Sequence, residues 1–149
     1  MDGYVFDTNV FNDILDEKVD ISIFSRLKLF VTHIQHDELM HTKDEIRRDQ
    51  LLSIFSQLDP SVGPTESFII GYSRLGGAKL GDGTIYLKIL SQLDGLKKKP
   101  NNRCDALIGE AALKNHLILV TKDNNLFMVM EKMGCSVLKL DELLDILAV

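Results

Sequence analysis

Short apolar runs alternate with longer amphipathic stretches along most of the chain. The apolar runs are rich in β-branched and aromatic residues, which is typical of strands. One of them, LILVT at residues 117–121, is apolar throughout, as expected for a strand that is buried on both faces. The pattern predicts strands at residues 3–6, 29–34, 117–121 and 136–140.

Helices are predicted where apolar residues recur with the helical period. Pro100 ends one of these stretches, and Asn101 or Asn102 can cap the next. The pattern predicts helices from Thr8 or Asn9 to about Asp16, and at residues 35–58, 84–96, 103–115, 125–133 and 141–148.

Residues 59–83 give the weakest pattern in the chain. They contain the turn sequence DPSVGP and a glycine-rich stretch, GYSRLGGAKLGDG at residues 71–83, for which we expect a mobile loop. This stretch lacks the G-x-x-x-x-G-K-[ST] spacing of a nucleotide-binding loop, so its role stays open.

Strands that alternate with helices indicate a parallel sheet covered by helices on both faces. A length of 149 residues fits one domain with a substantial core. We therefore expect a single α/β domain over residues 1–149. It should be a three-layer α/β/α sandwich around a mainly parallel sheet of about four to five short strands.

Composition narrows the class of protein further. Hydrophobic residues make up 45% and charged residues 26%, which is typical of a globular chain. The cysteines, Cys104 and Cys135, form neither a disulfide framework nor a CxxC zinc motif. The first residues do not resemble a signal peptide, and no apolar stretch reaches about 20 residues. We therefore expect a cytoplasmic protein without a membrane span.

The net charge of −5 bears on the choice of partners. It argues against a module that binds DNA by broad phosphate neutralisation, because such modules are usually basic. It does not exclude a nuclease, because carboxylates that hold metal ions also make a chain acidic.

Four acidic residues are predicted to lie near the carboxyl ends of the strands. Asp7 directly follows the first strand, and Asp123 lies two residues beyond LILVT. Glu38 lies about one turn into the helix that follows the second strand, and Asp105 opens the helix that precedes LILVT. Ligands of open α/β sheets bind at this edge.

Four carboxylates at one edge repel each other, which raises their pKa values or demands a cation. Oxygen ligands suit Mg²⁺ or Mn²⁺. Two such ions can activate a water molecule and stabilise the leaving oxygen of a phosphodiester. The pattern thus predicts phosphodiester hydrolysis with Mg²⁺ or Mn²⁺ as cofactor.

Each acid also has a purely structural interpretation. Asp7 and Asp123 can cap the helices that follow them. Asp105 can interact with the dipole of its helix, and Glu38 can be a solvated helix residue. No single position distinguishes these interpretations from a metal site.

Four segments in order carry a resemblance to a known family. VFDTNVF, THIQHDEL, NNRCDALIGEAAL and LVTKDNNLF resemble the motifs of PIN-domain nucleases, the family that includes VapC-type ribonuclease toxins. The resemblance implies metal ligation by Asp7 and Asp105, and by Glu38 and Asp123 directly or through water. Asn124 and Asn125 depart from the acidic or aromatic residues often found after the last acid.

The resemblance also implies roles for residues around the acids. Asn9 would orient the first acid or a metal-bound water, and the Thr121 hydroxyl would hold the loop of Asp123. Basic residues near the acids are candidates for binding nucleic-acid phosphates. These candidates are Arg103, Lys97, Lys98 and Lys99.

Substrate and partners are expectations from the family alone. They are single-stranded RNA as substrate, an antitoxin protein as partner, and a possible homodimer. The cut site, the physiological metal and the choice between RNA and DNA stay open.

Three other functions fit part of the pattern. A phosphohydrolase of the haloacid-dehalogenase type needs a second acid two residues after the first, where this chain has Asn9. A receiver-like signalling domain needs paired acids after the first strand, and Asp7 stands alone there. A catalytically silent PIN-fold module that binds nucleic acid or protein stays open, because ligand residues can persist where activity is lost.

Overall fold

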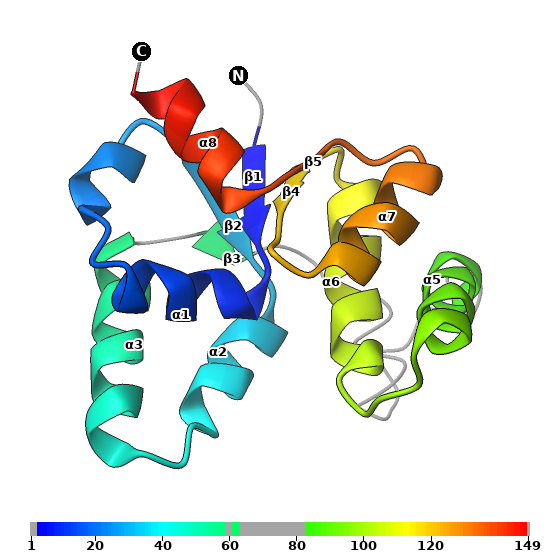
Figure 1. The fold of residues 1–149 in the computed structure, drawn as a ribbon, viewed down its shortest axis with the longest axis horizontal. Coiled ribbons are helices and arrows are strands. Elements are labelled where there is room, and N and C mark those ends of the chain that lie inside the picture. Colours follow the sequence, from blue (N-terminus) through cyan, green and yellow to red (C-terminus); the bar gives the residue numbers. More distant parts are fainter. Residues whose placement is uncertain (1–2, 59–60, 63–82, 149) are drawn as a thin grey trace.

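The computed structural model describes residues 3–58, 61–62 and 83–148 (Figure 1). Within these ranges, a five-stranded sheet has the order β3-β2-β1-β4-β5, and every neighbouring pair is parallel. The strands are β1 Gly3–Phe6, β2 Lys28–Val31, β3 Ser61–Val62, β4 Ile118–Val120 and β5 Val137–Leu138.

Helices connect these strands and account for most of the described residues. The predicted glycine-rich loop at residues 71–83 lies outside the described residues, except for Gly83, which begins a helix. The helices are α1 Thr8–Asp16, the 3-10 helix η1 Ile21–Phe24, α2 His33–Met40, α3 Glu45–Leu58, α5 Gly83–Leu96, α6 Asn102–Lys114, α7 Asn124–Lys132 and α8 Leu140–Leu147.

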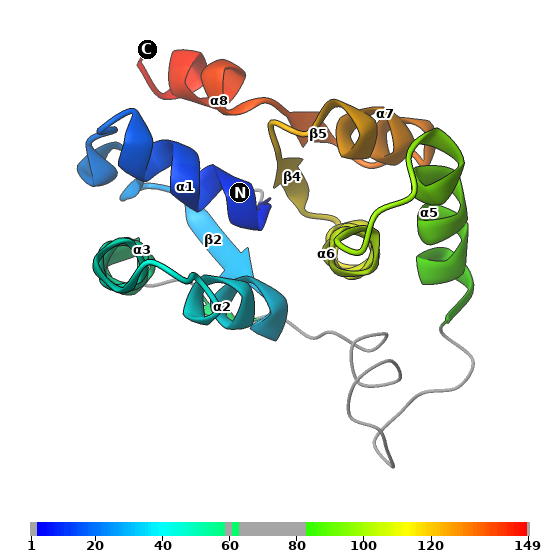
Figure 2. The ribbon, with the colours of Figure 1, turned by 60° about the horizontal axis from the view of Figure 1, so that its bottom comes forward.

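The sheet separates two apolar cores because successive side chains of a strand point to opposite faces. Val5 and Leu119 pack with α5, α6 and α7 on one face. Phe6 and Val120, the next residues, pack with α1, α3 and α8 on the other. Figures 1 and 2 show α5, α6 and α7 gathered on one side of the sheet and α1 and α3 on the other. The predicted three-layer α/β/α sandwich is confirmed.

The second predicted strand is wrong beyond Val31. β2 ends there because Thr32 caps α2: the Thr32 hydroxyl accepts the Ile34 amide hydrogen, and Gln35 Oε1 accepts the Thr32 amide hydrogen at 2.8 Å. This reciprocal arrangement is a capping box, which fixes a helix start.

The single helix predicted over residues 35–58 is two helices, α2 and α3. Asp44 begins the second, because its carboxylate accepts the backbone N–H groups of Ile46 and Arg47. Strand β3 was also missed, since Ser61–Val62 lies inside the predicted turn DPSVGP and pairs in parallel with β2.

No helix in the described ranges has both the length and the apolar character needed to cross a membrane.

Gln35 connects the start of α2 to the end of β1. Its side chain is fully buried, and Nε2 donates to the carbonyl oxygen of Phe6 at 3.1 Å. The same side chain accepts from the amide and the hydroxyl of Thr32. This set of bonds fixes where the chain leaves the sheet at Asp7.

Replacing Gln35 by alanine should destabilise the fold. The Q35A variant leaves the Phe6 carbonyl and the Thr32 donors without these partners, which costs about 1–3 kcal/mol for a buried group. Urea unfolding measures the loss, and the exposed Gln50→Ala on α3 serves as the control. Equal midpoints for the two variants would contradict this role of Gln35.

Candidate functional site

Asp7 is held at the carboxyl edge of the sheet by both backbone and side-chain bonds. Its amide donates to the carbonyl oxygen of Val120 at 2.9 Å, which continues the pairing of β1 with β4 by one residue. The residue is 1% exposed, and its carboxylate accepts the Thr121 hydroxyl at 2.9 Å. The sheet therefore fixes the position of this acid.

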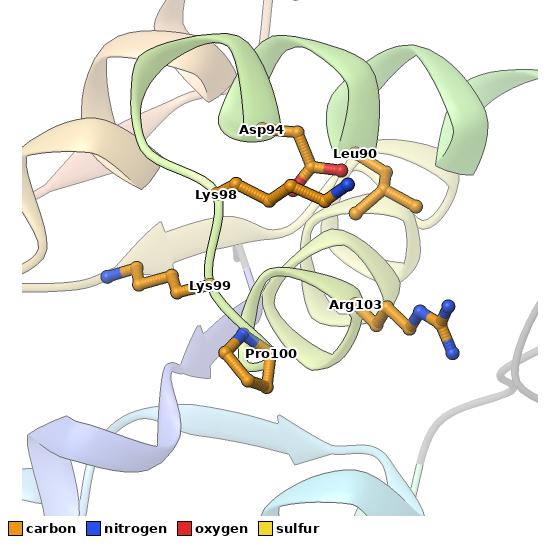
Figure 3. A pocket seen from close by; sticks show the side chains of 6 residues that line it. All are labelled: Leu90, Asp94, Lys98, Lys99, Pro100 and Arg103. Carbon is orange, nitrogen blue, oxygen red and sulfur yellow. The ribbon is translucent and has the colours of Figure 1, made fainter.

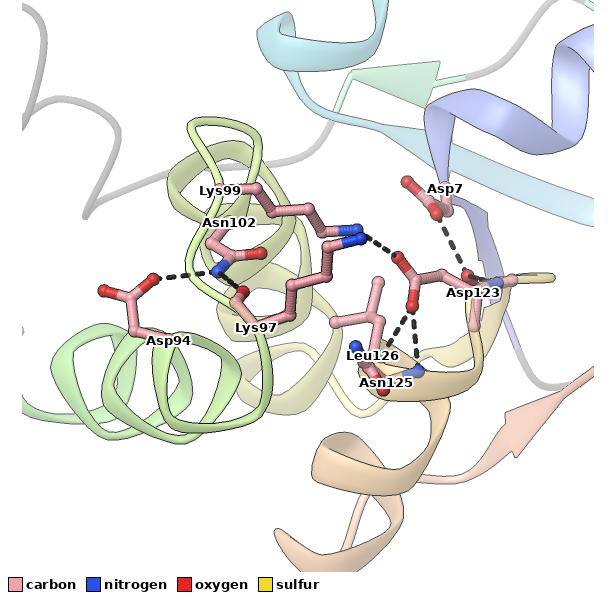
Figure 4. A network of polar contacts seen from close by, with 9 residues as sticks. Asp7, Asp94, Lys97, Lys99, Asn102, Asp123, Asn125 and Leu126 are labelled. Carbon is pink, nitrogen blue, oxygen red and sulfur yellow. Dashed lines mark hydrogen bonds and ion pairs between the residues drawn. The ribbon is translucent and has the colours of Figure 1, made fainter.

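Asp123 lies beside Asp7 because both contact the same hydroxyl. Its amide donates to Thr121 Oγ1 at 3.1 Å, while that hydroxyl donates to Asp7 (Figure 4). Asp123 Oδ1 also caps α7, accepting the amides of Asn125 and Leu126. Asp123 therefore both caps α7 and belongs to the site.

Glu38 reaches the same edge from α2. Its carboxylate accepts the hydroxyl of Thr8, the residue that follows Asp7, at 2.5 Å. Burial raises the pKa of Glu38, and the Thr8 hydrogen bond partly lowers it. Thr8 therefore orients this acid relative to Asp7.

Asp105 lies in the first turn of α6 and is 8% exposed. Burial raises its pKa to about 8, and the charges of Asp7, Asp123 and Glu38 add to the shift, while Lys99 opposes it. α6 runs back along the sheet before β4 begins, so its first turn lies at the carboxyl edge.

Asp7 shows the same repulsion. Burial raises its pKa to about 6, the Thr121 hydrogen bond lowers it, and the charges of Glu38 and Asp123 raise it further. The structure therefore brings the four predicted acids into one group of interacting charges. We call this group the acidic rim: Asp7, Glu38, Asp105 and Asp123.

Comparisons with solved structures show which fold carries this rim. A chain of DNA-bound VapBC from Salmonella typhimurium is 17% identical, with a TM-score of 0.61 over 93% of this chain and 98% of that one. A chain of promoter-bound VapBC2 from Rickettsia felis is 14% identical, with a TM-score of 0.59 over 91% and 97%. VapBC-5 from Mycobacterium tuberculosis, described as a member of the VapBC family of toxin-antitoxin systems, is 18% identical, with a TM-score of 0.55 over 93% and 98%.

The chain has the VapC-like PIN-domain fold. This confirms the fold that the sequence resemblance predicted. No protein-family model matches the chain, and no curated protein matches it. The similarity to these structures therefore concerns the architecture.

Oxygen donors gathered in the acidic rim suit a hard cation such as Mg²⁺ or Mn²⁺. In residues 3–58, 61–62 and 83–148, however, no group of three Asp, Glu, His or Cys side chains is arranged to hold a metal ion. Glu38 is turned to Thr8, and Asp123 is engaged by the α7 amides. This PIN-domain fold thus gathers the donors without aligning three of them as ligands.

Lys99 supplies a positive charge to the rim. Its ammonium group lies 3.4 Å from Asp123 Oδ2, and it comes from the segment between α5 and α6 (Figure 4). It was predicted only as a phosphate-binding residue. The other three predicted basic residues, Lys97, Lys98 and Arg103, are exposed.

One contact of the site was missed in the sequence, and one predicted contact is not found in the described part of the chain. Thr8 was interpreted as a possible cap, whereas its side chain holds Glu38. Asn9, predicted to orient the first acid, is exposed on α1, and no hydrogen bond of its side chain is found among the described residues. Its role stays a prediction. A threonine directly after the first acid was the only available signal for Thr8.

The raised pKa values give the rim a defined effect on stability. Between the unfolded value of 3.8 and the folded values of about 6 and 8, the native state binds more protons than the unfolded state. The free energy of unfolding therefore falls as pH rises through this range.

Asp105→Asn should remove part of this dependence. In a buffer that contains a chelator, we expect the variant to have a higher melting temperature than the wild type at pH 8.5. Each kcal/mol of repulsion that the substitution removes should raise the melting temperature by about 2–4 °C. The difference should shrink at pH 5, where the wild-type carboxyl is protonated. Thermal unfolding at both pH values measures it, with Asp49→Asn on the exposed face of α3 as control. A difference that does not depend on pH would contradict the assignment.

Proposed function

We propose that this chain is a divalent-metal-dependent nuclease that hydrolyses phosphodiester bonds, with single-stranded RNA as substrate. The observation that carries the proposal is the mutual repulsion within the acidic rim. The four acids come from four segments of the chain and lie at the edge where ligands of parallel sheets bind. In addition to burial, the charges of Glu38 and Asp123 raise the pKa of Asp7, and those of Asp7, Asp123 and Glu38 raise the pKa of Asp105. Such repulsion is relieved when a divalent cation binds.

Asp7 and Asp105 are the proposed principal ligands of Mg²⁺ or Mn²⁺, with Glu38 and Asp123 completing the set directly or through water. A bound ion of this class stabilises the negative charge that develops on phosphoryl oxygens. Thr121 holds Asp7 and the backbone of Asp123 in place. Hydrogen bonds of this kind to the ligands tune a metal site.

RNA binding would use the exposed basic residues next to the rim. Lys97, Lys98 and Arg103 are available to phosphates in the described part of the chain, where none of them forms an ion pair. Phosphate contacts position a strand without reading its sequence. The choice of RNA over DNA follows from the resemblance to VapC-type ribonucleases.

A protein partner is part of the proposal. The three solved structures compared above are VapBC structures, and one is described as a member of the VapBC family of toxin-antitoxin systems. We propose that this chain is the toxin of such a pair, with an antitoxin protein as partner, and that it forms a homodimer.

A second candidate is a catalytically silent PIN-fold binding module. The observation that favours it is the arrangement of the rim, in which no three described side chains form a ready ligand set. Cleavage experiments distinguish the two candidates directly.

Asp7→Asn should abolish Mn²⁺-dependent cleavage of single-stranded RNA. The change keeps the shape of the side chain but removes its charge, and we expect at least a roughly hundredfold loss, more than for a residue that only orients a ligand. Gel analysis of a labelled RNA measures cleavage, with Asp49→Asn as the matched control. Undiminished cleavage by D7N would refute the nuclease site, and no cleavage by the wild type would favour the silent module.

Lys99→Met should increase the affinity for Mn²⁺. The Lys99 ammonium group competes with a cation for Asp123, and a partly exposed ion pair contributes about 0.2–1 kcal/mol, so binding should be tighter by a factor of roughly 1.4 to 5. Titration calorimetry with Mn²⁺ alone measures the change. Lys132→Met, at an exposed position of α7, is the control. Weaker binding by K99M would contradict the competition.

A further inference from the structure

A pocket of about 480 Å³ opens between α5 and the start of α6 (Figure 3). This volume lies within the range of ligand sites. Its walls combine three cations, one carboxylate and two apolar side chains. They are Lys98, Lys99, Arg103, Asp94, Leu90 and Pro100.

The pocket adjoins the acidic rim through Lys99. This residue lines the pocket, and its ammonium group contacts the Asp123 carboxylate at 3.4 Å. A chain of nucleotides with its scissile phosphate at the rim would therefore place a neighbouring nucleotide at the pocket.

Asp94 is fixed inside the pocket by a buried amide. Asn102 is 1% exposed, and its Nδ2 donates to Asp94 Oδ1 at 2.8 Å and to the carbonyl oxygen of Lys97 at 2.9 Å (Figure 4). Asp94 Oδ2 has no hydrogen-bond donor among the residues that the structure describes. An ionised carboxylate only accepts hydrogen bonds, so this oxygen is suited to a ligand donor.

The cations of the pocket suit an anionic group beside that donor. Figure 3 shows the Lys98 side chain beside Asp94 and Leu90 of α5, while the Arg103 side chain extends from α6. A planar guanidinium binds phosphate in a bidentate manner or stacks on a base. A ligand with a phosphate, a flat ring and a hydrogen-bond donor matches all of these groups.

We propose that this pocket binds one nucleotide of the RNA next to the scissile phosphate and selects its base through Asp94. The proposal rests on the proposed nuclease function. Guanine presents two adjacent donors on its Watson–Crick edge, which one carboxylate can accept together. Uracil presents one donor between two acceptors, which the carboxylate repels. The pocket therefore favours guanine over uracil.

Asp94→Asn tests the selection. The amide keeps an oxygen for Asn102 but replaces an acceptor by a donor, which suits uracil better than the carboxylate does. Two RNA oligonucleotides of A and C, one with a single G and one with a single U, are bound to protein that carries Asp7→Asn and measured by fluorescence anisotropy. Without Asp94→Asn we expect roughly tenfold tighter binding of the G oligonucleotide, and with it a preference within about twofold.

Matched variants keep the result interpretable if D94N is unstable. Arg103→Ala should weaken binding of both oligonucleotides, whereas Arg26→Ala, just before β2 at the opposite edge of the sheet, should leave it unchanged. Equal affinity for the G and U oligonucleotides with Asp94 present would contradict the proposed pocket. Binding of the oligonucleotides by R103A as tightly as by R26A would also contradict it.

Cleavage by the wild-type protein separates this proposal from the nuclease proposal. Cut sites enriched in G at one flanking position, with the enrichment lost in D94N, support both. Cleavage without such enrichment overturns the pocket and leaves the nuclease. A G preference in binding without any Mn²⁺-dependent cleavage overturns the nuclease and leaves the pocket.

Discussion

Negative charge concentrated at the carboxyl edge of the sheet is the constraint on which the rest of the site depends. Asp7 and Asp105 are almost completely buried, and each has a pKa far above that of a free aspartate. Burying charges that repel one another opposes folding. The burial of apolar side chains in the two cores must therefore offset the free energy that the buried acids cost. Groups that destabilise the fold in this way are common at functional sites.

The topology of the sheet makes the arrangement possible. β1 and β4 are adjacent and parallel, so residues that are far apart in the chain leave the sheet at the same edge. One hydroxyl, that of Thr121, then joins Asp7 to the loop of Asp123. A single threonine at the end of a central strand thus sets the relative positions of two acids. Thr8 performs the corresponding task for Glu38 from the other side.

Lys99 connects the acidic rim to the basic pocket between α5 and α6. Its ion pair with Asp123 is partly exposed, so this pair contributes little to the stability of the fold. Lys99 can therefore exchange Asp123 for another partner at a small cost in free energy. Asp94, by contrast, is bound by the buried amide of Asn102. The two acids on either side of Lys99 therefore differ in kind: one belongs to a group of repelling charges, and the other is a fixed acceptor in a cationic pocket. This difference supports metal binding at the first and base selection at the second.

The sequence by itself determined the fold class, most strand positions and the four acids of the rim. Asp7 and Asp123 were predicted because an acid that closely follows an apolar run marks the end of a buried strand, and parallel strands end at one edge. Glu38 and Asp105 lie in helices, so their prediction depended on where those helices begin and on the resemblance to PIN-domain nucleases. Only the tertiary structure decided where β2 stops, because Thr32 and Ile34 by themselves suit a strand as well as a helix. The hydrogen bonds of Gln35 to Phe6 and to Thr32 fix the start of α2 there. The contacts Thr8–Glu38, Asn102–Asp94 and Lys99–Asp123 were also decided there. Each joins side chains from different elements, and local propensity carries no information about which distant side chain a polar group will meet.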